Sequence, residues 1–228
     1  MKLFIKKMCA VFSGCAVLAS FAGCSKDDEK KNNANSDFAD AVGSMAQEDL
    51  PYGATITQLK PEYNENLKIG IEYDNRYLTE EQATKLSDYV AALSESDGEL
   101  LSKTFYPPVL EHIIESSEKA DADEYVAGIH DNIRDNYIGY DFKFDYILVE
   151  NCLTESDPDS DTNFSSVDST IIGYGGEELA DKITDRKLVT FDIEYGIDGE
   201  EGSYMLSTST STSSTLYIYT IDGEIYIL

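Results

Sequence analysis

Apolar residues recur at intervals of three and four between residues 79 and 135, which is the spacing of amphipathic helices. Thr79 and Gln82 have the residue types and the separation of a capping box, so the first helix is predicted to begin there. Later helices are expected to open at Pro107-Pro108 and at Asp121, because proline suits a first helical turn and aspartate accepts hydrogen bonds from free N–H groups. The side chains expected on the buried helix faces are Ala83, Leu86, Tyr89, Val90, Leu93, Leu100, Leu101, Phe105, Val109, Leu110, Ile113, Ile114, Tyr125, Val126, Ile129 and Ile133.

From Tyr140 onward the apolar spacing shortens to two, which is typical of strands. One long strand is expected to carry on a single face Phe142, Phe144, Tyr146, Leu148 and Cys152. Further strands are predicted at residues 67–73, 167–174, 188–195, 203–212, 216–219 and 224–227. The last two flank Asp222-Gly223, a strong signal for a hairpin turn. Helices followed by strands predict an α+β fold, with N-terminal helices packed on a curved antiparallel sheet of about four to six strands.

Residues 207–215 are all serine or threonine. Apolar alternation resumes on both sides of this run, so a two-sided polar edge strand with a turn is predicted. An exposed loop or a glycan acceptor is the alternative interpretation of such low complexity.

The first residues resemble an export signal. Lys2, Lys6 and Lys7 precede an uncharged, mostly apolar stretch at residues 8–22 that ends in small residues, which predicts a secretory signal peptide over residues 1–23. The stretch is shorter than the ~20 residues of a membrane-spanning helix, and an uncleaved signal anchor is the alternative.

Four residues at the end of this signal resemble a bacterial lipobox: Phe21, Ala22, Gly23 and Cys24. In lipoproteins of that family the cysteine receives a diacylglyceryl group and the chain is cut just before it. The resemblance implies that Cys24 is the lipidated N-terminus of a protein anchored to the extracytoplasmic face of a bacterial cell membrane. Residues 24–48 are then expected to form a polar tether, and residues 49–228 a single α+β domain.

The charge balance limits the partners of the chain. Its 228 residues include 44 Asp and Glu against 17 Lys and Arg, a formal net charge of −27. Residues 1–23 contain three lysines and no acid, so their removal changes −27 to −30. Such a surface repels phosphate, which excludes nucleic acid and a bare anionic membrane surface as partners. A basic protein or another cationic partner is favoured, and an unknown small-molecule ligand stays open.

Cysteine and histidine offer few reactive groups. Cys9 and Cys15 would leave with the signal peptide and Cys24 would carry lipid, so Cys152 alone remains and is expected to be a buried small hydrophobe rather than a reactive thiol. His112 and His130 are expected at the boundaries of amphipathic helices rather than as general bases.

Residues 157–168 have the oxygen spacing of an EF-hand calcium loop. Thr162 stands where that loop has glycine, and the final acid is an aspartate rather than a glutamate. A weak calcium site is one interpretation, and a solvated acidic hairpin loop is the favoured one; no other cofactor is expected. The candidate ligands are Asp157, Asp159, Asp161, Asn163 and Asp168.

Two segments resemble the nuclear-transport-factor-2-like fold, the cystatin-like cone: residues 89–97 and the closing residues 217–227. The resemblance implies a cone-like part over about residues 78–228, and the family includes enzymes as well as ligand-binding and assembly domains. Phe144-Asp145-Tyr146 offers a carboxylate and a phenol for an enzyme of this kind, although strand alternation aims Asp145 away from its apolar neighbours.

Together these patterns predict a lipid-anchored extracytoplasmic protein with a non-catalytic binding or assembly role. A small-molecule enzyme using an apolar cone pocket with buried Asp or Tyr is one alternative, and a weak calcium-dependent surface module is another. The 16 tyrosines suit half-buried strand positions, and a stacking platform for sugars is the alternative reading of their number.

Overall fold

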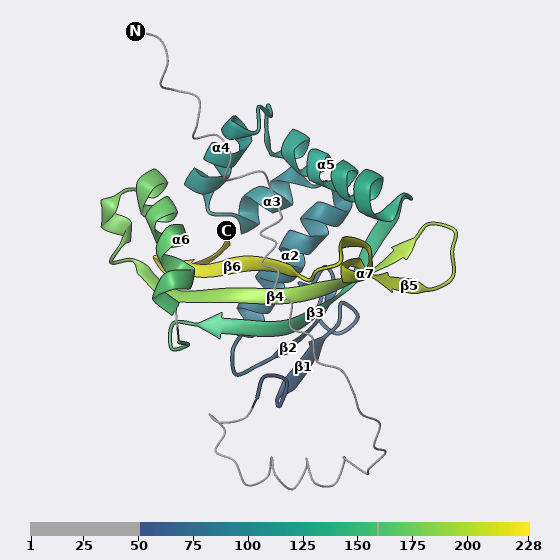
Figure 1. Ribbon diagram of the computed structural model, residues 1–228, viewed down its shortest axis with the longest axis horizontal. Coiled ribbons are helices and arrows are strands. Elements are labelled where there is room, and N and C mark those ends of the chain that lie inside the picture. The colour runs from purple at the N-terminus through teal and green to yellow at the C-terminus, as the bar shows by residue number, and fades with distance from the viewer. Residues whose placement is uncertain (1–50, 159) are drawn as a thin grey trace, which may run out of the picture.

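The computed structural model describes residues 51–228 apart from residue 159 (Figure 1). The predicted signal peptide, the lipobox residues with Cys24, and the tether therefore lie outside the described residues, as does the candidate calcium ligand Asp159. Within the described residues, no helix is long and apolar enough to cross a membrane.

Seven strands of the described chain form one curved, open sheet in the order β1-β2-β3-β4-β6-β7, with β5 paired to β4. The α+β class is confirmed, but the sheet is mixed rather than antiparallel, because β2 and β3 pair in parallel. Four helices separate β2 from β3 in the chain, and such a long crossover allows the chain to return in the same direction. The strands are β1 (Ile56–Leu59), β2 (Gly70–Asp74), β3 (Phe142–Thr154), β4 (Ile183–Ile197), β5 (Ser203–Met205), β6 (Ser214–Ile221) and β7 (Glu224–Ile227).

The helices predicted in the first half are confirmed: α2 (Glu80–Glu95), α3 (Gly98–Thr104), α4 (Pro107–Ser116) and α5 (Ala122–Ile133). Thr79 and Gln82 form the expected capping box, and the Asp121 side chain accepts a hydrogen bond from the Glu124 N–H. Their apolar faces, joined by the core side of the sheet, form the main hydrophobic core. A π-helical turn (Arg134–Ile138) follows α5.

The long strand β3 is confirmed, and Phe142, Phe144 and Cys152 are buried as predicted, but the middle of its buried face differs from the predicted one. Register shifts between Phe144 and Tyr146, and again between Val149 and Asn151, break the strict alternation. Ile147 and Val149 are therefore buried, whereas Tyr146 and Leu148 are only partly buried. Each extra residue in a β-bulge moves the following side chains to the other face of the sheet.

Residues 160–175 form helix α6 (Ser160–Gly175), so both the predicted strand at 167–174 and the predicted acidic hairpin loop are wrong. Phe164, Val167 and Ile171 are spaced by three and four residues, which puts them on one helical face. That face packs in a second hydrophobic cluster against Tyr219 of β6 and part of α4. A short helical turn (Glu177–Leu179) then leads to β4.

The serine- and threonine-rich segment also differs from expectation. It forms the short helix α7 (Leu206–Thr210) and the start of β6 instead of one polar edge strand. The buried Asp192 carboxylate accepts hydrogen bonds from the backbone N–H and the hydroxyl of Ser207, which fixes the start of α7. The predicted hairpin at Asp222-Gly223 is confirmed: φ is 55° and 86° at the two residues, as a type I′ turn requires.

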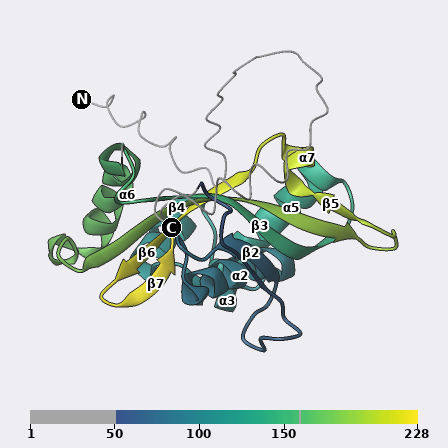
Figure 2. The ribbon, with the colours of Figure 1, turned by 90° about the horizontal axis from the view of Figure 1, so that it is seen from below.

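The two faces of the sheet are covered differently. Figure 2 shows α2 and α3 on one side of the sheet and α7 on the other, with α6 beyond one end. In Figure 1, α4 and α5 lie at the end of the molecule opposite to β1.

Candidate functional site

The described residues of the candidate calcium site do not form a common ligand cluster. Asp161, Asn163 and Asp168 lie on α6, where helical rather than loop geometry sets their directions. Asp157 precedes the helix and accepts hydrogen bonds from the backbone N–H and hydroxyl of Thr154 at 2.6 and 2.9 Å. In the part of the chain that the structure describes, no three His, Cys, Asp or Glu side chains are grouped so as to hold a metal ion.

Asp168 has a structural role in the described contacts. Its Oδ1 accepts hydrogen bonds from Arg186 Nε at 3.0 Å and from the hydroxyl of the fully buried Tyr219 at 2.9 Å. Arg186 also pairs with Glu155 at 2.7 Å. Burial, and then the Asp168 carboxylate, raise the pKa of Tyr219 above its ordinary value, so the phenol stays a hydrogen-bond donor. This cluster joins α6 to the sheet.

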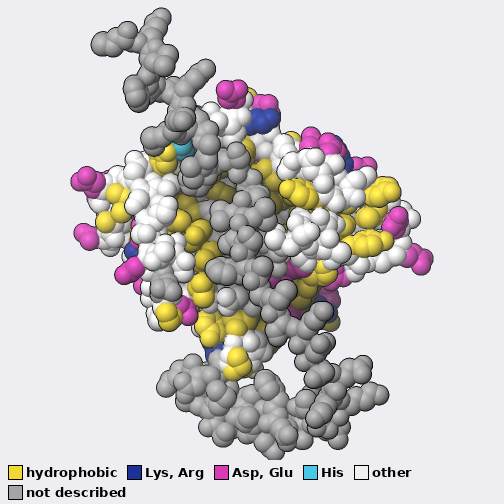
Figure 3. All heavy atoms as spheres, viewed as in Figure 1, with side chains coloured by type: hydrophobic (Ala, Val, Ile, Leu, Met, Phe, Trp, Pro, Cys, Tyr) yellow, Lys and Arg dark blue, Asp and Glu magenta, His cyan; other side chains and the backbone are white. Residues whose placement is uncertain are grey.

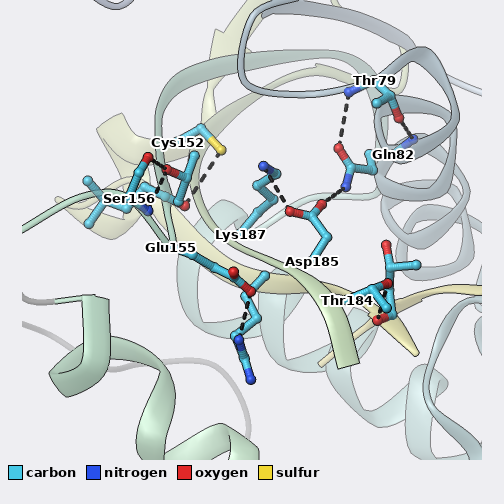
Figure 4. A network of polar contacts seen from close by, with 12 residues as sticks. Thr79, Gln82, Cys152, Glu155, Ser156, Thr184, Asp185 and Lys187 are labelled. Carbon is cyan, nitrogen blue, oxygen red and sulfur yellow. Dashed lines mark hydrogen bonds and ion pairs between the residues drawn. The ribbon is translucent and has the colours of Figure 1, made fainter. Parts of the chain in front are cut away.

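Cys152 is buried, as predicted, with 2% of its surface exposed. Lys187 and Asp185 act on it electrostatically, and Figure 4 shows both labelled beside it. Burial raises the pKa of the thiol to about 12, and the opposing effect of Lys187 does not offset it. A thiol with this pKa is protonated at neutral pH and is a poor nucleophile.

The polar contacts around Asp185 join α2 to β4. Gln82 completes the capping box of α2 and also donates from Nε2 to Asp185 Oδ2 at 2.6 Å (Figure 4). Lys187 pairs with the same carboxylate at 3.0 Å. Because these groups bind one another, the cluster is explained by the attachment of α2 to the sheet.

The two histidines lie where amphipathic helices meet other elements, as predicted. His112 of α4 stacks on Tyr174 of α6 with ring centroids 4.1 Å apart, and His130 of α5 stacks on Phe142 of β3 at 4.6 Å. His130 Nδ1 also lies 3.1 Å from the carbonyl oxygen of Leu93. Both rings therefore have packing partners that account for their positions.

Asp145 and Tyr146 do not form a common pocket. Asp145 is exposed, as strand alternation predicted. The Tyr146 hydroxyl is buried and has no hydrogen-bond partner among the described residues. Burial, followed by the charges of Glu72 and Glu194, raises the pKa of this phenol. Neither Asp145 nor Tyr146 lines either of the two surface depressions described below.

An open groove of about 600 Å³ lies between α3, α4 and the start of α5. Its larger apolar lining residues are Leu110 and Ile114 of α4 and Pro107 at the N-terminus of that helix, with Ala120 and Ala122 on the opposite wall. The charged residues that line the groove are all acidic: Glu99, Glu111, Glu115, Asp121 and Asp123. The groove combines an apolar floor with an acidic rim.

Local contacts place the two walls of the groove. Asp123 at the start of α5 accepts a hydrogen bond from the Gly98 N–H at 2.9 Å, which brings the first turns of α3 and α5 together. A Cβ atom at residue 98 would lie 2.4 Å from the Asp123 backbone nitrogen, so only glycine allows this approach. Asp97 and Asp121 cap α3 and α5 by accepting from N–H groups at 2.8 and 2.9 Å.

The rim carboxylates differ in how they are neutralised. Glu99 pairs with Lys103 at 2.6 Å, but both side chains are largely exposed and such pairs are weak. Within residues 51–228, residue 159 excepted, the side-chain carboxylates of Glu111 and Glu115 have no described hydrogen bond or ion pair, and both residues are exposed. No lysine or arginine is among the lining residues of the groove, so the lining carries only negative formal charges.

A second depression of about 530 Å³ lies over the first half of α2 and the β1–β2 loop. Its lining is polar: Asn64, Asn66, Glu80, Glu81, Thr84, Lys85 and Asp88. Asn64 donates to Glu80 at 3.1 Å, and burial raises the pKa of Asp88. This depression offers no apolar floor, so it is less suited to hold another polypeptide than the groove.

The groove was not anticipated as a site, although one of its signals is present in the sequence. Leu110 and Ile114 are four residues apart, and so are Glu111 and Glu115, which places an apolar row beside an acidic row on one helix. The opposite wall depends on the contact between Gly98 and Asp123, which are 25 residues apart.

Comparisons of this chain with protein-family models, with curated proteins and with solved structures found no match.

Proposed function

We propose that this chain is a lipid-anchored, extracytoplasmic protein with a non-catalytic role, which binds another polypeptide in the groove between α3, α4 and α5. The observation that supports binding most directly is the groove itself, where the partly exposed Ile114 lies beside Glu111 and Glu115, whose carboxylates have no described hydrogen bond or ion pair. Grooves of this kind accept side chains of a partner, which cover the apolar floor and meet the rim charges.

The anchoring part of the proposal rests on the N-terminal sequence. The charged start, the short apolar stretch and the lipobox-like Phe21-Ala22-Gly23-Cys24 together favour lipid attachment at Cys24. In Figure 1, β1 near the first described residues and the groove helices α4 and α5 lie at opposite ends of the molecule. The chain that follows Cys24 would thus enter the described domain at the end far from the groove.

Cys24→Ala tests the anchor. In a bacterial host that processes lipoproteins, the wild-type chain is expected in the membrane fraction after metabolic labelling with a fatty acid, and the variant is expected without label and without signal cleavage at this site. Labelling and processing that are unchanged in the variant would refute lipidation at Cys24.

Site-specific photocrosslinking tests the binding role. A benzoylphenylalanine placed at Glu111 in the full chain is expected to give, in living cells, a discrete crosslinked species with another protein. The same residue placed at Glu62, an exposed position in the β1–β2 loop outside the groove, is the matched control. A comparable yield from both positions, or none from Glu111, would contradict binding in the groove.

A further inference from the structure

We infer that the occupant of this groove is a cationic, amphipathic segment of a partner protein, whose apolar side chains lie on the floor and whose Lys or Arg side chains reach the rim. The inference rests on the proposed function, because it identifies the chemistry of the partner for the same groove. It follows from how α4 and α5 arrange apolar and acidic side chains.

Helix α4 presents two parallel rows to the groove. Leu110 and Ile114 form the apolar row, and Glu111 and Glu115 form the acidic row, one helical turn apart in each case. Leu110 is almost fully buried in the main core and Ile114 packs against that core while staying partly exposed, so the floor is continuous with the core. A partner side chain that packs on Ile114 removes apolar surface from water on both molecules.

Asp121 and Asp123 supply negative charge from the opposite wall. Each already accepts a backbone N–H through Oδ1, at 2.9 Å in both cases, so these carboxylates are held in place before any partner binds. A partner segment in the groove therefore meets carboxylates on both flanks of the apolar floor. Figure 3 shows acidic side chains, with a few basic ones among them, along the upper edge of the described surface, over α4 and α5.

Charge complementarity selects the occupant. A partner segment with neutral side chains beside the rim would leave the rim carboxylates unpaired, and one with acidic side chains there would be repelled by them. Lys or Arg side chains at the same positions would pair with these carboxylates. The same rim repels phosphate groups, which disfavours an anionic lipid surface in this groove. The apolar floor supplies affinity, and the charged rim supplies specificity and a faster encounter.

The dimensions fit one short helix or an extended segment of similar reach. Helix α4 has ten residues, which at 1.5 Å each span about 15 Å. A partner helix of about ten to fourteen residues, with apolar residues every three or four positions, would lie along it in the helix-in-groove mode.

Synthetic peptides test this inference on the full chain in non-ionic detergent. The probe is a fluorescent 14-residue peptide in which Leu occupies one helical face and Lys the other. A Lys/Ser peptide keeps the charge without the apolar face, and a Glu/Leu peptide keeps the apolar face with the opposite charge. The Lys/Leu peptide is expected to bind at least tenfold more tightly than either of the others at low salt.

Paired charge reversals show whether the groove is the site. Glu111→Lys with Glu115→Lys is expected to weaken binding of the Lys/Leu peptide by about tenfold or more, as the loss of a complementary rim predicts. Glu62→Lys with Glu65→Lys makes the same change in net charge outside the groove and is expected to weaken binding by less than about threefold, through the screened long-range field alone. If the reversed variant unfolds, Glu111→Gln with Glu115→Gln provides the same test with a smaller expected loss.

Three results would overturn the inference. The first is an equal loss of affinity for the Lys/Leu peptide from both charge reversals, which would assign binding to net charge alone. The others are a Lys/Ser peptide that binds as tightly as the Lys/Leu peptide, and no binding of the Lys/Leu peptide at all. If a crosslink from Glu111 persists in cells in any of these cases, the groove still binds a protein, and only the cationic, amphipathic nature of that partner is refuted. If the crosslink also fails, the proposed function fails with it.

Discussion

At the scale of single residues, Asp74 has the densest set of hydrogen bonds described in the molecule. Its fully buried carboxylate accepts from the Gly53 N–H at 2.9 Å, from Thr55 Oγ1 at 2.5 Å, and from Arg76 N, Nε and Nη2 at 3.1, 3.0 and 2.6 Å. Arg76 in turn donates to the Pro51 carbonyl oxygen at 2.7 Å. These hydrogen bonds connect residues 51–55, which are the first described residues, to Asp74 and Arg76 at the end of β2.

Asp74→Ala is expected to lower the free energy of unfolding by about 3–5 kcal/mol, because it removes one partner of a buried ion pair and leaves buried donors unpaired. Chemical denaturation followed by circular dichroism measures the change. The exposed Asp145→Ala is the matched control and is expected to change stability by less than about 0.5 kcal/mol. A similar small change for both variants would contradict the structural role of Asp74.

The pH dependence of this contribution has a definite sign. Burial alone would raise the pKa of Asp74, but the hydrogen bonds from Arg76, Thr55 and Gly53 outweigh burial and hold the pKa well below its usual range. A carboxyl with a lowered folded-state pKa stabilises the fold above its unfolded pKa of about 3.9, and this stability is lost as the pH falls further. The stability difference between wild type and Asp74→Asn should therefore shrink only below about pH 4.

Residue-scale expectations succeeded where one side chain and its neighbours in the chain decide the outcome. The burial of Cys152 followed from its apolar surroundings in the sequence, and the boundary positions of His112 and His130 followed from helical spacing. The proximity of Lys187 to Cys152 did not follow, because it depends on the register of β3 against β4, which pairs Thr154 with Lys187.

At the scale of elements, the helices with clear caps were predicted and α6 was not. The capping residues Thr79 and Asp121 act on adjacent backbone, so their signal is local. In α6, the apolar residues Phe164, Val167 and Ile171 form only a narrow stripe among serine and aspartate residues. The spacing of the oxygen-bearing residues at 157–168 suggested a loop, so the helical spacing of the apolar residues was not recognised. The bulges of β3 likewise have no signal in simple alternation.

The attachment of α6 to the sheet yields a prediction at this scale. Tyr219→Phe keeps the ring in the second hydrophobic cluster but removes the hydroxyl that donates to Asp168, so it is expected to cost about 1 kcal/mol of stability. Tyr226→Phe, a change of the same size on β7 where no hydroxyl hydrogen bond is described, should be nearly neutral. A double-mutant cycle with Asp168→Ala measures the coupling, and zero coupling would contradict this contact.

At the scale of the whole molecule, the α+β class could be predicted from the order of helical and strand patterns, but the mixed sheet and the groove could not. The parallel pairing of β2 with β3 is a property of the long helical crossover. The groove exists because α3 and α5 approach each other at Gly98 and Asp123 while α4 forms the floor. Such contacts join distant parts of the chain, and local patterns do not report them.

The large net charge predicts a response of the whole fold to salt. A chain with a formal charge of −27 repels itself, and raising the ionic strength from 0.01 to 0.1 M shortens the Debye length from about 30 to about 10 Å. The melting temperature is therefore expected to rise over this range. The rise should be smaller in Glu62→Lys with Glu65→Lys, whose charge is −23 after two acids become two bases. A melting temperature that falls with salt would contradict net self-repulsion.

We propose above all that this molecule binds its partner in the groove between α3, α4 and α5. Hydrogen–deuterium exchange of the full chain, with and without the Lys/Leu peptide, tests it most directly, because it reports where on the molecule binding slows amide exchange. We predict protection of residues 98–104, 107–116 and 120–124, with exchange unchanged in the β1–β2 loop. Protection that falls on the sheet or on that loop, while α4 exchanges as before, would contradict the claim.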